Sequence, residues 1–475
     1  MTGRPVVVAS NRGPVSFVRD PVSGEVSARR GAGGLVTALG GALRIAGGTW
    51  IAAAMSDEDR AHALRGGADL DDAGFRLRSL AFDPVRYDDF YNSISNGVLW
   101  FTHHLLWEPA RTPRFDERTF SAWESYRAVN AGFADALAEA GDDPAFLVQD
   151  YHLALVPAML RERVPSARIA HFSHIPFAAP GFFRILPQRI RTEVLRGLLG
   201  ANVLGFQARM WADNFLLCCR DLDGARVNLT RRTIRWEGRE VRVRINPISI
   251  EVEPLREVAR SPEVANRKRR IARSRGDRRL LLRVDRAELS KNILRGFLAY
   301  ELFLRRHPEW RGRVVFLALL NPSREAIPEY RTYLDECLEI VGRINEEFGD
   351  RHRMPIVTSV KDDFPLSVAA YTMYDALMVN PVLDGMNLVA KEGPILNRRR
   401  GALILSTNAG AFDELGRHAI PVDPFDLLDQ AEAIRRALEM PADERARRAR
   451  GLRAAVRRNP LDRWVRSQLD DLERT

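Results

Sequence analysis

Residues 376–392 of this 475-residue chain read Ala376-Leu-Met-Val-Asn-Pro-Val-Leu-Asp-Gly-Met-Asn-Leu-Val-Ala-Lys-Glu392. The apolar run at the start predicts a buried strand, Asp384-Gly385 predicts a turn, and Met386 to Lys391 predicts the first turns of a helix. Such a unit can bind an anion, because free backbone N–H groups and the positive helix end point at the ligand. Four side chains capable of chemistry are crowded here: Asp384, Asn387, Lys391 and Glu392. In isolation the pattern is equally typical of an ordinary loop with solvated charges.

Short apolar runs of the same kind alternate with helical patterns along the whole chain. The predicted strands are Val6–Ser10, Gly48–Ile51, Ala145–Val148, Arg168–Ser173, Val203–Phe206, Leu280–Val284, Val314–Leu320, Pro355–Thr358, Ala376–Val379 and Ala402–Leu405. This alternation predicts an α/β fold, in which parallel sheets carry helices on both faces. The segment from Arg231 to Arg244 alternates as a hairpin does.

Several helices are also predicted. Glu117 to Ala138 has a long helical pattern, and Tyr91 to Leu105 has an amphipathic one that carries Trp100. A glycine-rich turn at Gly31–Gly34 opens a further helix, which ends at Leu43. The arginine-rich tail from Ala442 to Arg474 is predicted to be helical.

The chain is too long for a single hydrophobic core. A charged, weakly apolar segment from Glu253 to Arg278 separates two series of strands and helices. We therefore predict two doubly wound, Rossmann-like domains, residues 1–246 and 247–455, followed by a C-terminal helix at 456–475. The expected site lies in the cleft between the domains, outside the carboxyl ends of the strands.

Net charge is +10 and the isoelectric point is about 9.9, values that admit nucleic acid as a partner. The basic runs are Arg267–Arg270, Arg398–Arg400 and the arginines between Arg445 and Arg458. They are dispersed and lack interleaved aromatic residues, so solvated helix faces explain them more simply than nucleic-acid binding. A modest positive field would also gather phosphorylated substrates.

No apolar run approaches the roughly 18 residues of a membrane span, and no signal peptide precedes the first strand. The three cysteines, Cys218, Cys219 and Cys337, do not form a disulfide framework, so we expect a cytoplasmic protein. No cluster of cysteine and histidine has zinc spacing, and neither a metal nor a cofactor is expected. A homo-oligomer is compatible with the sequence.

Polar sets follow four of the predicted strands. They are Asn11-Arg12, Asp150-Tyr-His152, His174, and Arg286 with Lys291. Singly, each has a structural interpretation: Asp150 would cap the next helix, His174 would be a hydrogen-bonded core residue, and the cations would be solvated. Together they predict a site, in which two cations hold a diphosphate as its bond breaks, without a metal.

Eight motifs occur in the order found in one known family. They are Ser10-Asn-Arg12, Gly33-Gly34, Tyr91-Asn92 with Trp100, Asp150-Tyr-His152, His174-Ile-Pro-Phe177, Leu204-Gly-Phe-Gln207, Arg286 with Ser290-Lys291, and Asp384 to Glu392. The chain thus resembles the trehalose-6-phosphate synthases, which are retaining glycosyltransferases of family 20 with a two-domain GT-B fold. The likeness runs from residue 6 to about residue 430. In this fold the terminal helix usually returns to the N-terminal domain.

The resemblance implies a role for each matching residue. The pocket for the acceptor, glucose 6-phosphate, is implied at Arg12, Trp50, Tyr91, Trp100, Asp150 and Arg324. The site for the nucleotide-sugar donor is implied at Gly33, Gly34, His174, Arg286, Lys291, Phe364, Asp384, Met386, Asn387, Leu388, Val389 and Glu392. The catalytic set is implied at Asp150, His174, Arg286, Lys291 and Asp384. In the family the leaving phosphate helps to deprotonate the acceptor hydroxyl, and no carboxylate attacks the sugar.

Some residues depart from the usual family pattern. Ala287-Glu-Leu-Ser-Lys-Asn292 stands where Leu-Asp-Tyr-Ser-Lys-Gly is usual, Leu383 replaces a common arginine, and Gly393-Pro394 replaces an aromatic or apolar pair. A proline there is expected to restrict or kink the helix. Asn292 and Gly393-Pro394, together with Asn321-Pro322 and Asp423-Pro-Phe-Asp426, resemble an actinomycete branch that includes validoxylamine-7'-phosphate synthase, which uses a GDP-activated cyclitol. We therefore expect GDP-glucose in preference to UDP-glucose, with a pseudo-glycosyltransferase as the alternative.

Overall fold

The structure, a computed structural model, describes residues 4–21, 23–30, 36, 39, 40, 43, 48–65, 75–350 and 353–474. The chain divides into two compact units. Unit 1 comprises Met1–Ile248 and Leu461–Thr475, and unit 2 comprises Ser249–Pro460. The glycine-rich turn at residues 31–34 and most of the helix predicted after it lie outside the described residues, and so do Gly33 and Gly34.

The described part of unit 1 is built on a sheet of nine strands in the order β5-β4-β1-β6-β7-β8-β11-β10-β9. The strands are β1 (Val6–Arg12), β4 (Gly48–Ala53), β5 (Arg76–Leu80), β6 (Ala145–Gln149), β7 (Arg168–Ser173), β8 (Val203–Phe206), β9 (Arg226–Asn228), β10 (Thr233–Trp236) and β11 (Arg239–Ile245). Neighbours from β5 to β11 are parallel, and β10 pairs antiparallel with both β9 and β11. The hairpin predicted between residues 231 and 244 is therefore confirmed as β10 and β11.

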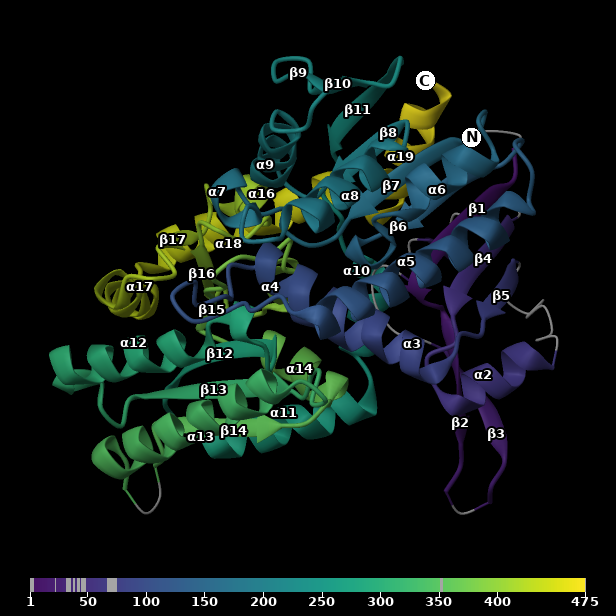
Figure 1. The fold of residues 1–475 in the computed structure, drawn as a ribbon. Helices are drawn as coiled ribbons and strands as arrows, with labels where there is room; N and C mark the ends of the chain where they lie inside the picture. Colours follow the sequence, from purple (N-terminus) through teal and green to yellow (C-terminus); the bar gives the residue numbers. More distant parts are fainter. Residues whose placement is uncertain are drawn as a thin grey trace. The chain divides into compact units, whose positions relative to one another are not determined.

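Helices and one hairpin complete unit 1 (Figure 1). They are β2 (Val15–Arg19), β3 (Val26–Arg30), α2 (Asp57–Leu64), α3 (Pro84–Asp88), η2 (Asp89–Leu99), α4 (Trp100–His103), α5 (Glu117–Ala138), η3 (Tyr151–Leu153), α6 (Val156–Arg163), α7 (Pro180–Phe183), α8 (Gln188–Leu199), α9 (Arg209–Cys219) and α19 (Leu461–Glu473). Helix α19 packs on β7 and β8, where Trp464 meets Phe172 edge-on. The segment predicted as one α-helix over 91–105 is instead the π-helix η2 followed by the short α4, and the N–H of Trp100 donates to the carbonyl of Ser95, five residues earlier.

In its described residues, unit 2 carries a six-stranded, fully parallel sheet in the order β14-β13-β12-β15-β16-β17. The strands are β12 (Arg279–Arg286), β13 (Val314–Asn321), β14 (Ile356–Val360), β15 (Ala376–Val379), β16 (Ala402–Ser406) and β17 (Ile420–Val422). The helices are α10 (Val252–Val258), α11 (Pro262–Arg275), η4 (Leu289–Lys291), α12 (Ile293–Arg306), η5 (Pro308–Trp310), α13 (Pro328–Phe348), α14 (Phe364–Tyr371), α15 (Val389–Leu396), α16 (Phe412–Leu415), α17 (Leu427–Glu439) and α18 (Ala442–Arg458).

Alternating side chains of β13 pack on opposite faces of this sheet. Phe316, Ala318 and Leu320 enter the core shared with α12, α13 and α17. Val315, Leu317 and Leu319 face the side covered by α11 and α14. Because both faces are covered, the strands are continuous apolar runs, as expected for a parallel sheet. The predicted α/β fold with two doubly wound halves is confirmed.

The structure of residues 376–392 departs from the prediction at one point. The helix predicted to start at Met386 starts at Val389, because Asn387 has a φ of 74°, which an α-helix does not admit. Helix α15 then continues through Pro394 and ends two residues later. Within the described residues, no helix is long and apolar enough to cross a membrane.

Candidate active site

In each sheet, the first strand in sequence has earlier-added strands on one side and later-added strands on the other, so the direction of winding reverses beside it. The reversal lies between β1 and β6 in unit 1 and between β12 and β15 in unit 2. In open α/β sheets, ligands bind outside the carboxyl ends of the strands at such a reversal. A predicted site residue lies at or soon after the end of each of these four strands: Arg12, Asp150, Arg286 and Asp384. The fold thus gives each unit its own candidate half-site.

Asp150 is held in an unusual conformation directly after β6. Its φ of 73° lies in the left-handed region, where a residue with a side chain is uncommon. Its carboxylate does not cap the next helix; Oδ1 accepts the backbone N–H of His174 at 3.1 Å, and Oδ2 lies 3.8 Å from Nδ1 of His152. Such strain persists where the surroundings enforce it, and it is concentrated at functional sites. The capping interpretation of Asp150 is therefore wrong.

His174 lies in a chain of hydrogen bonds that joins four segments of unit 1. Its Nε2 lies 3.0 Å from Oε1 of Gln149, and its Nδ1 lies 3.3 Å from Nε2 of Gln207. Oε1 of Gln207 in turn accepts the N–H of Ile248 at 2.7 Å. A neutral imidazole with its proton on Nε2 satisfies every one of these contacts. Burial, with a smaller effect from His171, lowers the pKa of His174 to about 3, so the ring is neutral at pH 7.

This chemistry predicts an acid sensitivity of the fold. Burial lowers the pKa of His103 and His174 to about 3 and that of His171 to about 4. Because the folded-state pKa lies below the ordinary value of 6.5, these groups stabilise the fold fully above about pH 6.5 and progressively less as the pH falls. We expect Tm, followed by calorimetry, to fall between about pH 7.5 and 5, with a weaker fall in His174→Gln. A constant Tm over that range would contradict the buried neutral histidines.

Aromatic rings surround the end of β1 and the start of η3. Tyr91 stacks on Tyr87 at 6.0 Å and on His152 at 5.8 Å between ring centroids. The hydroxyl of Tyr87 donates to Oδ1 of Asn11 at 3.0 Å, so the aromatic group is tied to the strand that ends at Arg12. Tyr91 is partly exposed and Arg12 is exposed, and both can therefore meet a ligand.

Two predicted aromatic residues are buried instead. Trp50 is fully buried, and its indole N–H donates to Oγ of Ser10 at 2.8 Å. Trp100 is 5% exposed and stacks on His104 at 3.8 Å between ring centroids. Trp50 therefore supports the end of β1 in this structure, and a contact of its own with a substrate would require the surrounding residues to move.

Lys291 and Asp384 meet directly in unit 2. Nζ of Lys291 lies 2.5 Å from Oδ2 of Asp384, and the amide of Asn387 donates to the same oxygen at 3.0 Å. Both partners of this ion pair retain 13% exposure of their side chains, so it opens to solvent. The resulting set combines an ammonium, a carboxylate and an amide at the strand reversal.

Glu288 joins the two arginines of this half-site. Oε1 of Glu288 lies 3.1 Å from a guanidinium nitrogen of Arg286 and 3.1 Å from one of Arg324, and it accepts the hydroxyl of Ser323 at 2.8 Å. Its carboxylate is fully buried, which alone would raise its pKa; the charges of Arg286, Arg324 and Lys291, together with the Ser323 hydrogen bond, instead lower the pKa to about 2. Glu288 is therefore ionised and holds both guanidinium groups near one point.

The turn after β15 is clamped by the loop that follows β16. The N–H of Gly410 donates to the carbonyl of Asp384 at 2.9 Å, and that of Ala411 donates to the carbonyl of Met386 at 2.8 Å. A Cβ atom on Gly410 would lie 1.9 Å from the carbonyl oxygen of Gly385, so this approach requires glycine. Oδ1 of Asn387 accepts the N–H of Ala390 at 3.2 Å at the start of α15.

The two charged residues early in α15 have different environments. Lys391 is fully buried and pairs with Glu414, so it serves the packing of unit 2. Glu392 is partly exposed; burial raises its pKa, and a hydrogen bond with Tyr371 lowers it.

Leu388 and Val389 lie at the helix start, where N–H groups lack intrahelical partners. Phe364 begins α14 with 46% exposure and is not brought into contact with this set.

A buried arginine that the sequence motifs do not single out lies beneath the half-site. Arg283 is fully buried in β12 and binds Oδ2 of Asp285 at 3.0 Å, the carbonyl of Lys291 at 3.0 Å and Oδ1 of Asn380 at 3.1 Å. It thereby ties the loop that carries Lys291 to the strand before Asp384. A charged residue inside the apolar run 280–284 was the available signal, because buried charges are rare unless they are paired.

The departures from the usual family pattern have local structural causes. Asn292 has a φ of 58°, a conformation that suits glycine or asparagine, and its amide donates to the carbonyls of Asn380 at 2.9 Å and Pro424 at 2.7 Å. A Cβ atom on Gly393 would lie 2.4 Å from the side chain of Leu377, and Leu383 is 6% exposed. These positions are buried and pack against their own unit.

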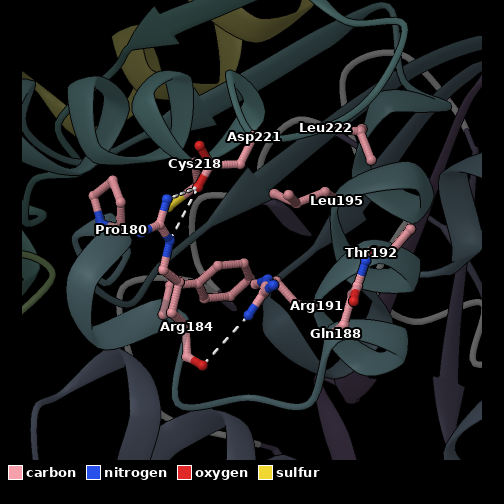
Figure 2. Close-up of a pocket in the computed structure, with 10 residues that line it drawn as sticks. Pro180, Arg184, Gln188, Arg191, Thr192, Leu195, Cys218, Asp221 and Leu222 are labelled. Atoms are coloured by element: carbon pink, nitrogen blue, oxygen red, sulfur yellow. Dashed lines mark hydrogen bonds and ion pairs between the residues drawn. The ribbon is translucent and has the colours of Figure 1, made fainter.

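Other features of the described residues do not form part of either half-site. Figure 2 shows residues that line a small cavity in unit 1, among them Arg184, Asp221 and Cys218. Arg184 binds Asp221 at 2.7 Å, and the volume of the cavity is about 40 Å³. This volume is too small for a sugar, and burial raises the pKa of the Cys218 thiol to about 12. Among the described residues, no group of three or more histidine, cysteine, aspartate or glutamate side chains is arranged to hold a metal ion.

The sequence model of "Glycosyltransferase family 20" matches residues 4–474 of the chain. Trehalose-6-phosphate synthase of Mycolicibacterium paratuberculosis is 37% identical over 98% of this chain and 94% of its own length. Validamine 7-phosphate valienyltransferase of Streptomyces hygroscopicus subsp. jinggangensis is 33% identical over 99% of this chain and 95% of its own length. The bifunctional trehalose-6-phosphate synthase/phosphatase of Thermoproteus tenax is 34% identical over 97% of this chain, which spans 62% of that relative.

Solved structures match over nearly the whole chain. The E. coli protein bound with UDP-2-fluoro glucose superposes with a TM-score of 0.85 and 29% identity, covering 99% of both chains. The UDP-forming α,α-trehalose-phosphate synthase of Burkholderia xenovorans in complex with glucose-6-phosphate has a TM-score of 0.83 and 27% identity, and the match covers 99% of this chain and 100% of that one.

Proposed function

The chain belongs to glycosyltransferase family 20, and on that premise we propose that it joins glucose from a nucleotide-diphosphate glucose to glucose 6-phosphate, forming trehalose 6-phosphate. It is a glycosyltransferase of the trehalose-6-phosphate synthase type. The observation that carries the specific reaction is the cation set at the strand reversal of unit 2, where Glu288 holds Arg286 and Arg324 while Lys291 pairs with Asp384.

On the donor side, Arg286 and Lys291 stabilise the negative charge that develops on the diphosphate as its bond to the sugar breaks. The carboxylate of Asp384 accepts hydrogen bonds from the glucose hydroxyls, and Glu392 does so from the ribose. The backbone at Met386, Asn387, Leu388 and Val389 binds phosphate at the start of α15. The family resemblance assigns Gly33 and Gly34 to the same diphosphate. Phe364, exposed at the start of α14, packs on the base.

On the acceptor side, we assign Arg12, Tyr91, Trp100 and Arg324 to the pocket for glucose 6-phosphate. Asp150, held in strain beside His174, positions the acceptor hydroxyl. His174 is neutral, so it contacts the donor glucose without adding charge. Trp50 supports this pocket from beneath, through Ser10.

The reaction proceeds with retention and without a covalent glycosyl-enzyme. The bond from the glucose C1 to the diphosphate oxygen breaks while a bond from C1 to the acceptor hydroxyl oxygen forms on the same face. The hydroxyl proton passes to the leaving phosphate. The cations of this chain supply the charge stabilisation, so we propose that the transfer is metal-independent and needs no cofactor. NMR of the product would show the α configuration at both anomeric carbons, and a β linkage would refute retention.

The acceptor assignment predicts a selective kinetic effect. Replacing Arg324 with alanine removes a guanidinium group from the proposed acceptor pocket, so the KM for glucose 6-phosphate should rise at least about tenfold, whereas the donor KM should change much less. Steady-state kinetics with each substrate varied in turn measures both values. The matched control is Arg295→Ala. Arg295 contacts Asn292 and Phe425 and is not assigned to the acceptor pocket. Equal effects on both KM values would mean that Arg324 is misassigned.

The donor is proposed to be GDP-glucose in preference to UDP-glucose. Its support is the resemblance to the actinomycete branch, which Asn292, Asn321-Pro322 and Gly393-Pro394 carry. The reaction is placed in the cytoplasm, where phosphorylated sugars are made. Nucleic acid and membranes are not proposed as partners, and a homo-oligomer is compatible with the proposal.

The domain assignment is likewise a proposal. Residues 1–246 form the acceptor domain, residues 247–455 form the donor domain, and residues 456–475 form a helix that returns to the N-terminal domain. The compact units, which change at Ile248/Ser249 and at Pro460/Leu461, support these boundaries to within a few residues.

A second candidate function is a pseudo-glycosyltransferase that takes a GDP-cyclitol. The valienyltransferase relative, which matches 99% of this chain at 33% identity, favours it. The two functions separate on the acceptor: product from a cyclitol phosphate, with none from glucose 6-phosphate, would establish the second candidate and exclude the first.

A further inference from the structure

A cavity of about 630 Å³ in unit 2 is lined by an unusual number of arginines. They are Arg256, Arg260, Arg398, Arg450, Arg453 and Arg457, and neither aspartate nor glutamate belongs to its lining. Two of the basic runs noted in the sequence, at 398–400 and 445–458, therefore meet in space although about 50 residues separate them. Neither half-site uses these residues.

Three segments place the arginines around the cavity. Arg450, Arg453 and Arg457 are spaced three and four residues apart on α18, and therefore share one face of that helix. Arg256 lies in α10, and Arg260 follows its end. Arg398 follows the end of α15 and precedes β16, and its N–H donates to the carbonyl of Thr372, which precedes β15. The cavity therefore opens near the amino ends of β15 and β16, whereas the donor cations lie at the carboxyl ends of strands.

Two of the six arginines have structural partners. Arg453 donates from Nε to the carbonyl of Pro394 at 3.1 Å and binds the carbonyl of Asn397, so it caps the C-terminal end of α15. Arg256 pairs with Glu253 at 2.7 Å. Across the residues that the structure describes, Arg260, Arg398, Arg450 and Arg457 make no ion pair with an acid. Four cations thus face one hollow without counter-charge.

A solvated helix face alone does not account for this arrangement. Elsewhere on α18, Arg448 pairs with Glu444 at 2.7 Å, as solvated helix faces commonly do. At the cavity, by contrast, cations from three segments converge, and the charge of Arg398, after burial, lowers the pKa of nearby Lys268. Like charges gathered at one place repel each other, and an anion bound among them would relieve that repulsion.

We propose that this cavity binds a small molecule that carries two or more phosphate groups. Arginine is the side chain best suited to planar, bidentate recognition of phosphate, and several converging arginines can hold several phosphates. A volume of about 630 Å³ lies within the range of small-molecule sites. The site is separate from the donor motif, since the two ends of α15 lie roughly 10 Å apart. This inference does not rest on the proposed transferase reaction.

The test is calorimetric titration with inorganic triphosphate. The donor cations also bind phosphate, so the measurement uses a background variant, Arg286→Gln with Lys291→Gln, in which that half-site is disabled. We expect binding to persist in this background and to weaken at least about tenfold when Arg450→Gln and Arg457→Gln are added. Arg447→Gln, an exposed arginine of α18 outside the cavity, should leave the affinity unchanged.

Any of three outcomes would overturn the proposal. One is the absence of triphosphate binding in the background variant at moderate salt, provided that Tm shows the protein to be folded. A second is an equal loss of affinity in Arg447→Gln and in the cavity variant, because that would indicate a diffuse basic surface. Tighter binding of a DNA duplex than of triphosphate, lost to the same extent in all these variants, would also identify such a surface.

Discussion

Lys291→Gln is expected to lower kcat by about 10²–10³-fold, with a much smaller change in the KM for glucose 6-phosphate. The glutamine keeps a polar group of similar reach but removes the positive charge next to the breaking bond. It also leaves Asp384 without the ammonium that lies 2.5 Å away, so the carboxylate that should receive the sugar is no longer oriented. Steady-state kinetics with saturating donor separates the two parameters.

Lys361→Gln provides the matched control for that exchange. Lys361 is 56% exposed and lies 3.7 Å from Asp363, away from the strand reversal. The kcat of Lys361→Gln should therefore stay within about twofold of the parent value. A Lys291→Gln enzyme that keeps more than about a third of the parent kcat would show that this cation does not stabilise the leaving group.

Glu288→Gln is expected to destabilise the protein by about 3–5 kcal/mol, because it removes the negative partner of a buried ionic group. The loss should appear as a fall in Tm together with a rise in both KM values, since Arg286 and Arg324 share the same carboxylate oxygen. Glu288 has a pKa lowered to about 2 from an ordinary value near 4.5, so its contribution is complete above about pH 4.5 and disappears as the pH falls towards 2. The difference in Tm between parent and variant should therefore shrink in acid.

Glu288→Asp tests whether the charge or the length of the side chain matters. Aspartate keeps the charge and is the residue usual in the family pattern, so this variant should recover most of the stability lost in Glu288→Gln. Glu432→Gln, which disrupts an exposed pair with Arg435, is the surface control and should cost no more than about 1 kcal/mol. A Tm for Glu288→Gln equal to that of the surface control would contradict the role assigned to this carboxylate.

The fold was predictable because it depends on patterns that are local in sequence. Apolar runs such as 203–206 and 376–379 coincide with β8 and β15, and the helix predicted at Glu117–Ala138 has the same bounds in the structure. The pairing of strands was not readable, since the order around β1 and β12 depends on contacts between segments far apart in the chain. The π-helix η2 was missed because its apolar spacing resembles that of an α-helix.

The candidate site was predictable in its residues but not in their partners. Motifs placed Arg286, Lys291 and Asp384 after strands, and the structure brings the last two into contact. The sequence did not indicate that Glu288 would hold Arg286 and Arg324 together, because Arg324 follows the neighbouring strand β13. Nor did it indicate that Asn292, a departure from the family pattern, donates a hydrogen bond to the carbonyl of Pro424, 132 residues further along the chain. Pairwise contacts of this kind require the fold.

The most direct test of the central claim is a transfer assay with the purified chain. Glucose 6-phosphate is incubated separately with GDP-, UDP- and ADP-glucose, and the products are identified by mass spectrometry and NMR. We expect trehalose 6-phosphate, formed fastest from GDP-glucose, with Lys291→Gln as the inactive comparison. The absence of any disaccharide phosphate with all three donors would contradict it.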